Sequence, residues 1–88
     1  MLVKINLDEV LEFVANGEDC KVEINQDGDA YVLPIEASGY GDTILTQYFE
    51  ADDYNECEDE QEYVNWLEDG FQNELEADNK VIKLELAK

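Results

Sequence analysis

The sequence has no histidine and no arginine, and its only basic side chains are five lysines. Without histidine, the most common general base and the imidazole ligand of metal sites are absent. Without arginine, no guanidinium can bind a phosphate through two parallel hydrogen bonds. Against the five lysines stand 24 aspartates and glutamates, which give a net charge of −19 at pH 7. Such a protein is repelled by nucleic acids, anionic lipid and acidic substrates, so we expect no direct nucleic-acid binding.

Cysteines and long apolar runs are also scarce. The two cysteines, Cys20 and Cys57, are too few and too far apart for a zinc site or a disulfide framework, so we expect free thiols. No run of about 18 apolar residues is present for a membrane span. The first residues lack the apolar stretch of a signal peptide. We therefore expect no membrane association and a cytoplasmic location.

The apolar content is nevertheless sufficient for a folded domain. Leu, Ile, Val and Phe account for 24 of the 88 residues, above the fraction of about 20% below which a highly charged chain is expected to be disordered. The length fits one domain over residues 1–88. A domain of this size has little room for a large enclosed cavity, and we expect no cofactor.

Local patterns near the N-terminus predict a helix and then a hairpin. Residues 1–5 are a short apolar strand or extended lead-in, and Asn6 with Glu9 forms a capping-box pattern at the start of a helix over 7–16. Asp27-Gly28 lies between two runs with strand character. A two-residue turn at this dipeptide would place Ile24 opposite Tyr31.

The second half of the chain predicts one more helix and two more strands. Residues 43–49 fit both a strand and a helix, and their Thr, Ile, Tyr and Phe favour a third strand. We expect a loop over 52–55, a helix over 58–69 with a final turn through Leu75, and a last strand over 81–86 whose core face carries Ile82, Leu84 and Leu86. The predicted fold is a small α+β domain with helices packed on one face of an antiparallel sheet, in the order helix, three strands, helix, strand.

Two patterns that resemble functional sites are better explained otherwise. Asn25, Asp27 and Asp29, with Glu36 at the twelfth position, have the spacing of a calcium loop, but Ala30 occupies the position that requires glycine. We therefore expect a hairpin and no metal site. Carboxylate pairs for glycosidase-like catalysis are abundant, but nothing singles out one member in an apolar pocket. We expect no enzymatic activity.

The acidic residues are concentrated in one part of the chain. Residues 22–79 contain 18 of the 24 acids and no basic side chain, and 13 acids fall within 50–78. Halophilic adaptation would spread acids evenly over the chain, and a moderate net charge already suffices for solubility. The concentration favours a ligand for a basic partner.

A helix over this acidic segment has two distinct faces. Cys57, Val64, Leu67 and Phe71 form its core stripe, with Tyr63 at the edge. The opposite face surrounds the only tryptophan with four acids; it consists of Glu58, Asp59, Glu62, Trp66 and Asp69. Glu58 and Glu62 are one helical turn apart, and their repulsion should destabilise the helix by a few tenths of a kcal/mol, so a lysine at position 62 would favour folding.

Such a surface has the charge spacing of DNA. Carboxylates about 6 Å apart along a helix approximate one phosphate strand. The surface could therefore occupy a DNA-binding cleft lined with Lys and Arg, steered there by long-range attraction. The candidate phosphate surrogates are Asp52, Asp53, Glu56, Glu58, Asp59, Glu60, Glu62 and Asp69, with Tyr54 and Trp66 as apolar anchors. Among the acids, Glu60 is turned toward the core stripe by the helical wheel.

The chain resembles the small acidic phage-encoded DNA mimics, most of all the anti-CRISPR proteins. The resemblance lies in the size, the order of elements, the Asp27-Gly28-Asp29 turn followed by Tyr31-Val32, and the run from Glu56 to Tyr63 that enters a helix. It implies an inhibitor, active in the cytoplasm of an infected bacterium, that occludes the DNA-binding or PAM-reading site of a CRISPR nuclease. The implied binding surface extends from Glu50 to Asp69.

Other functions are compatible with the same sequence. An antirestriction protein, a uracil-DNA glycosylase inhibitor or an immunity protein against a basic nuclease toxin would use the same acidic surface on another DNA-processing enzyme. A small acidic structural or adaptor domain would use the acids for solubility alone. We expect a monomer or a homodimer in each case.

Overall fold

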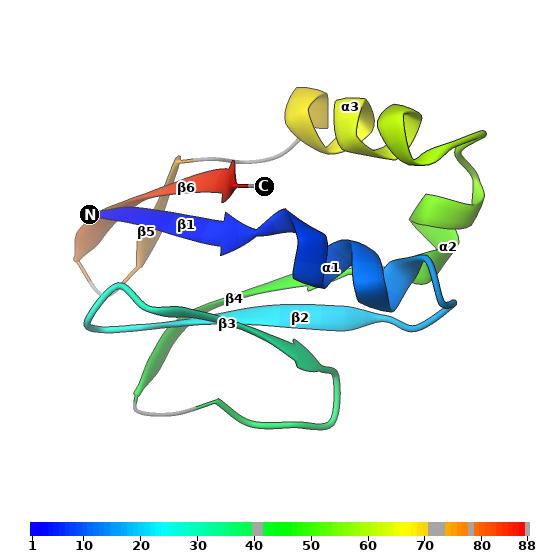
Figure 1. Ribbon diagram of the computed structural model, residues 1–88. Coiled ribbons are helices and arrows are strands. Elements are labelled where there is room, and N and C mark those ends of the chain that lie inside the picture. Colours follow the sequence, from blue (N-terminus) through cyan, green and yellow to red (C-terminus); the bar gives the residue numbers. More distant parts are fainter. Residues whose placement is uncertain (40–41, 71–73, 78, 88) are drawn as a thin grey trace.

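The computed structural model describes residues 1–39, 42–70, 74–77 and 79–87, which form an α+β fold (Figure 1). The elements are β1 (Leu2–Asn6), α1 (Leu7–Val14), β2 (Cys20–Asn25), β3 (Ala30–Pro34), β4 (Thr43–Phe49), α2 (Ala51–Asn55), α3 (Glu60–Gly70), β5 (Glu74–Ala77) and β6 (Lys80–Ala87). β1 continues directly into α1, and α2, α3 and β5 lie between β4 and the last strand.

The strands form two sheets, where the sequence predicted one. In the first, sheet A, the order is β1-β6-β5, with β1 parallel and β5 antiparallel to the central β6. In the second, sheet B, β2 lies between β3 and β4 and all pairs are antiparallel. The predicted turn through Leu75 is wrong, because residues 74–77 are β5 and pair with the last strand. The predicted element order also lacked β1 and α2.

The first helix begins where the capping pattern placed it. The Oδ1 atom of Asn6 accepts a hydrogen bond from the backbone N–H of Glu9 at 3.2 Å, and the Asn6 amide donates to the Glu9 carboxylate. The helix ends at Val14 instead of residue 16, and Gly17 then adopts φ +80° in the turn toward β2. A glycine adopts this left-handed conformation without a Cβ clash.

The predicted hairpin is present, but its register differs by one residue. Ile24 pairs with Ala30 instead of Tyr31, because the loop has three residues and Gly28 adopts φ +88°. The Oδ1 atom of the buried Asn25 accepts hydrogen bonds from the backbone N–H groups of Asp27 and Asp29, at 3.0 and 3.1 Å. These side-chain bonds stabilise the longer loop. Since a shift of one residue turns a strand over, Ala30 and Val32 pack against the core and Tyr31 faces away.

The remaining sheet predictions agree with the structure. Residues 43–49 are a strand, β4, which pairs with β2. In β6, Ile82 and Leu84 are buried and Leu86 packs against the core, as the alternating pattern predicted. Residues 40 and 41 of the predicted glycine loop lie outside the described residues, and Gly39 and Asp42 beside them have no regular secondary structure.

One hydrophobic core joins both sheets and the helices. It includes Val3 and Ile5 of β1, Val22 and Ile24 of β2, and the α3 side chain of Tyr63, which is one of the largest fully buried residues. The acidic helices are therefore held by apolar contacts on their inner faces. Figure 1 shows α2 and the start of α3 at the end of the molecule opposite the N-terminus.

Candidate acidic interaction surface

The first part of the candidate site is a short helix, where the sequence predicted a loop. α2 covers Ala51–Asn55 and follows β4 directly. Glu50, at its N-cap, makes no side-chain capping bond, but Oδ1 of Asp19 accepts a hydrogen bond from the backbone N–H of Ala51 at 2.8 Å. A carboxylate at this position satisfies an otherwise unpaired N–H group and interacts favourably with the helix dipole.

The second part links α2 to α3 and contains two acids with structural roles. Oδ1 of Asp59 accepts a hydrogen bond from the backbone N–H of Glu62 at 2.8 Å, which makes Asp59 the N-cap of α3. The Glu62 carboxylate in turn accepts the backbone N–H of Glu58 at 3.0 Å. The expectation that a lysine at position 62 would favour folding is therefore wrong, because this carboxylate stabilises the start of the helix.

Helix α3 begins at Glu60, two residues later than predicted, and separates an apolar face from an acidic one. Tyr63, Val64 and Leu67 are buried, as predicted. Phe71, the last member of the predicted core stripe, lies outside the described residues. Glu60 is exposed, so the helical-wheel argument that turned it toward the core is wrong. The wheel assumed a helix from residue 57, and Glu60 is the first helical residue instead.

Three aromatic rings connect the core to the acidic face. The rings of Tyr54 and Tyr63 meet edge to face, with centroids 5.2 Å apart, and the ring of Trp66 stacks on Tyr63 at 6.0 Å with an interplanar angle of 21°. Tyr54 is half-buried, whereas 51% of Trp66 is exposed. Trp66 is therefore the more accessible of the two predicted anchors.

The predicted acids lie on one continuous stretch of α2, the link and α3, which we call the acidic surface. All of them are exposed except Asp53, which is half-buried. Within the described ranges, none of them forms an ion pair with a lysine. The acidic surface comprises Asp52, Asp53, Glu56, Glu58, Asp59, Glu60, Glu62 and Asp69.

The thiol of Cys57 lies within the field of these carboxylates. Its Sγ atom is 3.4 Å from the backbone carbonyl oxygen of Asp53, which accepts its hydrogen bond. Desolvation, followed by repulsion from Glu62 and Glu56, raises the pKa of Cys57. Burial likewise raises the pKa of Cys20, which lies in the core, to about 11. Both thiols are free cysteines, and neither environment favours a reactive thiolate.

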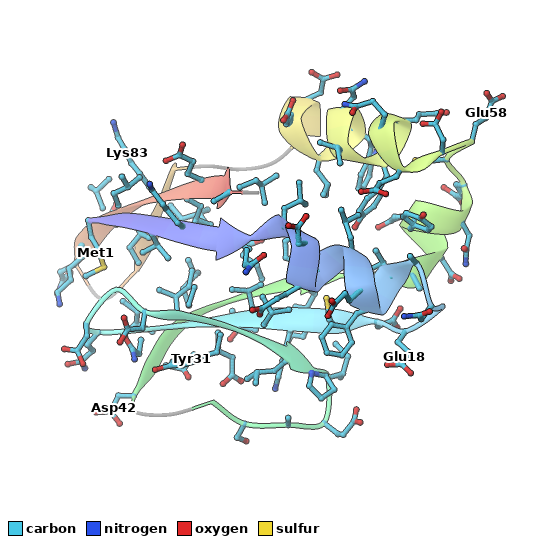
Figure 2. All side chains as sticks on the ribbon, in the orientation of Figure 1. Met1, Glu18, Tyr31, Asp42, Glu58 and Lys83 are labelled. Atoms are coloured by element: carbon cyan, nitrogen blue, oxygen red, sulfur yellow. The ribbon has the colours of Figure 1, made fainter. Side chains whose placement is uncertain are left out.

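Among the described residues, the exposed lysines lie on sheet A. In sheet A, Lys4 and Lys83 alternate with buried residues and are exposed on the outer face. Figure 2 shows Lys83 and Glu58 at opposite ends of the molecule. In sheet B, Lys21 pairs with Glu23 at 3.0 Å, and both side chains are largely buried. Within the described residues, the exposed lysines thus lie on sheet A, which also carries the exposed Glu85, whereas α2 and α3 carry acids and no basic residue.

No protein-family model, curated protein or solved structure matches this chain. Among the helices of the described residues, none is long and apolar enough to cross a membrane.

Three further acids, Glu18, Asp19 and Glu36, lie outside the predicted acidic surface. Asp19 caps α2, as described above, and with Glu18 and Glu36 it lines an open hollow that also contains the exposed Ile35. In Figure 2, Glu18 lies at the same end of the molecule as Glu58. No local sequence signal linked these acids to α2 and α3, because they lie 14 or more residues before Glu50, where the acidic segment begins.

The structure gives no support to the calcium-loop pattern. The Oδ1 atom of Asn25 is already bonded to two backbone N–H groups of the hairpin. In the described part of the chain, no three His, Cys, Asp or Glu side chains are grouped so that they could hold a metal ion. What this surface offers chemically is a set of positioned carboxylates around one exposed indole.

Proposed function

We propose that this protein is a DNA-mimic inhibitor that binds the Lys/Arg-lined DNA site of a DNA-processing enzyme. The target we propose is a CRISPR nuclease, whose DNA-binding or PAM-reading site the acidic surface would occlude. The choice of a CRISPR nuclease rests on the resemblance to anti-CRISPR proteins. The acidic-surface geometry supports the broader statement that the partner is basic.

The observation that carries the proposal is the position of acids that folding does not favour. Asp69 and its neighbour Glu68 occupy the last turn of α3, and Glu56 is the C-cap of α2. All three are exposed, and no basic residue lies in the last turn of either helix. A negative charge at a helix C-terminus is unfavourable by about 0.3–1 kcal/mol, and a lysine there would be favourable.

These acids differ from those that stabilise the fold. Asp59 and Glu62 form hydrogen bonds at the start of α3, where a carboxylate also suits the helix dipole. Glu56 and Asp69 have no such role in the described structure. Residues that lower stability and lie together on one exposed surface are typical of binding sites, where function and stability conflict.

The absence of basic residues from α2 and α3 supports an oriented approach to a basic cleft. Because α2 and α3 carry only acidic charges and the exposed lysines lie on sheet A, a positive cleft attracts the acidic surface more strongly than it attracts sheet A. Long-range attraction would speed this encounter, and close pairing with Lys and Arg would follow. Folded helices hold the carboxylates in place before binding, which lowers the entropy lost on association.

An order-of-addition assay tests the mechanism on purified, guide-loaded CRISPR nucleases of several types. We expect inhibition of target cleavage when the protein is added before the target DNA. We expect weak or no inhibition when the nuclease has already bound its target, because the same site is then occupied. Inhibition of no nuclease, or equal inhibition in both orders, would contradict occlusion of a CRISPR nuclease DNA site.

A further inference from the structure

Trp66 presents an exposed indole ring that packs on a buried aromatic ring. The residue is 51% exposed on the outer face of α3. Its ring stacks on Tyr63, with centroids 6.0 Å apart and an angle of 21° between the planes. Tyr63 is itself only 1% exposed and is held edge to face by Tyr54. A solvent-exposed indole that stands on a buried aromatic ring loses little freedom on binding.

The surroundings of this indole are acidic on both sides along the helix. Glu62 precedes it by four residues and Asp69 follows it by three, which places both on the same helix face. Both are exposed. The chain has no basic residue between 22 and 79, so no neighbouring side chain along the helix supplies a cation to the ring. The face therefore combines a π-surface with carboxylates that lack a counter-ion.

We propose that Trp66 receives an arginine side chain of the partner, whose guanidinium stacks on the indole while Glu62 or Asp69 accepts its N–H groups. The existence of that partner rests on the proposed function. Arginine fits better than lysine because its guanidinium is planar, weakly hydrated and able to stack and donate in the same plane. A lysine ammonium would gain the charge attraction without the stacking.

This contact has no counterpart in the sugar-phosphate backbone of DNA. A phosphate strand pairs with arginine through charge and hydrogen bonds alone, which salt weakens. Stacking on Trp66 adds an attraction that depends less on salt. Loss of the indole should therefore weaken binding at high and low salt alike, whereas Asp69→Asn should weaken it mainly at low salt.

The test uses two defined probes, an arginine-containing peptide and a lysine-containing peptide of equal length and charge. Trp66 is the only tryptophan, so its fluorescence reports binding to the wild-type protein directly. We expect tighter binding of the arginine peptide. In calorimetry, Trp66→Leu should weaken binding of the arginine peptide by about two- to fivefold, the range of an exposed cation–π contact. It should weaken binding of the lysine peptide by less. Trp66→Phe should restore part of the difference.

A second exposed aromatic residue provides the matched control. Tyr48 of β4 is 65% exposed and lies on sheet B, so Tyr48→Leu should leave the preference for arginine unchanged. Circular dichroism would verify that each variant is folded. Equal affinity for both peptides, or a Trp66→Leu effect no larger than that of Tyr48→Leu, would overturn the arginine proposal.

The outcome is separable from that of the proposed function. If the arginine preference is absent but the protein still inhibits a nuclease only before DNA is bound, DNA mimicry stands and the role of Trp66 as an arginine receptor is wrong. If the preference is present and no nuclease is inhibited, the arginine site stands and its partner belongs to another class of basic protein.

Discussion

The carboxylate of Asp19 accepts a hydrogen bond from the backbone N–H of Ala51 at 2.8 Å, across 32 positions of the chain. Asp19 immediately precedes β2, the central strand of sheet B, and Ala51 is the first residue of α2. This bond fixes the beginning of the acidic surface to the sheet. It also explains how a short helix forms in a segment whose own N-cap residue, Glu50, makes no side-chain capping bond.

We predict that Asp19→Ala destabilises the protein by about 1 kcal/mol, the usual effect of removing a side-chain acceptor from a helix N-terminus. Asp19→Asn should restore most of the loss, because its amide oxygen still accepts the bond. Glu18→Ala, at the neighbouring exposed acid, is the control and should have little effect. Urea denaturation measures the stability, and faster hydrogen exchange of the Ala51 amide would localise the change. An unchanged stability in Asp19→Ala would contradict this role.

The acids at the start of α3 should separate into structural and non-structural groups. Asp59→Ala removes the N-cap acceptor and should cost about 1 kcal/mol of unfolding free energy. Glu58→Ala should change stability by less than about 0.5 kcal/mol, because the bond at this residue uses the backbone N–H and remains. Chemical denaturation of the two variants side by side tests this. Equal losses of stability in the two variants would contradict the role of Asp59 as the N-cap.

The ion pair of sheet B predicts a dependence of stability on pH. The N–H of Gly39 donates to Glu23 Oε1 at 2.7 Å, and this bond, with Lys21, lowers the pKa of the Glu23 carboxyl. Because the folded-state pKa is the lower one, the contribution to stability is present above the unfolded value of about 4.3 and is lost as pH falls through the folded value. The difference in melting temperature between wild type and Glu23→Gln should therefore be largest near neutral pH and shrink in acid.

Gly39→Ala provides a second test of the same contact. A Cβ atom at this position would lie 2.9 Å from Glu23 Oε1, so the carboxylate must move. The variant should lose stability near neutral pH and show a reduced pH dependence below about pH 5. Glu12→Gln, on the exposed face of α1, is the control and should keep the wild-type profile. A pH-independent difference for both Glu23→Gln and Gly39→Ala would contradict the assignment.

The cysteines should react slowly with a neutral alkylating reagent. Cys20 is fully buried and its pKa is raised to about 11, so it is almost entirely protonated at pH 8. Cys57 is half-buried and its pKa is raised by desolvation and by Glu62. In a Cys20→Ser background, iodoacetamide should modify Cys57 more slowly than cysteine in an unstructured peptide, and Glu56→Gln should accelerate the reaction. A rate equal to that of the peptide would show that the acidic field does not reach this thiol.

Much of the fold follows from local patterns in the sequence. The cap at Asn6, the hairpin around Gly28 and the alternation in β6 depend on neighbouring residues, and all are present. The hairpin register was missed because two bonds to the side chain of Asn25 lengthen the loop, which the Asp-Gly dipeptide alone does not indicate. The inner and outer faces of α3 were also correct over most of their length.

What the sequence did not predict depends on contacts between distant residues. β1 pairs in parallel with β6, at the other end of the chain, so residues 2–6 show no local sign of their partner. The Glu74–Ala77 segment is rich in residues that favour helices, and its pairing with β6 makes it a strand. α2 depends on the distant Asp19, and the segment's Asp and Asn residues favour turns when considered alone. Within the site, Trp66 was identified, but its support by Tyr63 required the structure.

The central claim, that acids unfavourable for folding serve binding, is tested most directly by two triple variants of equal charge. The first replaces Glu56, Glu58 and Asp69 of the acidic surface with lysine, and the second replaces exposed acids elsewhere, Asp27, Asp42 and Glu85. Each set adds six charge units and changes the net charge from −19 to −13.

The decisive measurement is the inhibition of target-DNA cleavage by the two variants on the same guide-loaded nuclease, with urea denaturation of each. We predict that the acidic-surface triple loses inhibition while its stability stays close to that of the wild type, because lysines at 56 and 69 suit the helix C-termini and offset the less favourable lysine at 58, just before the N-cap of α3. The control triple should still inhibit. Equal inhibition by both triples, or equal loss in both, would contradict the claim that this surface binds the target.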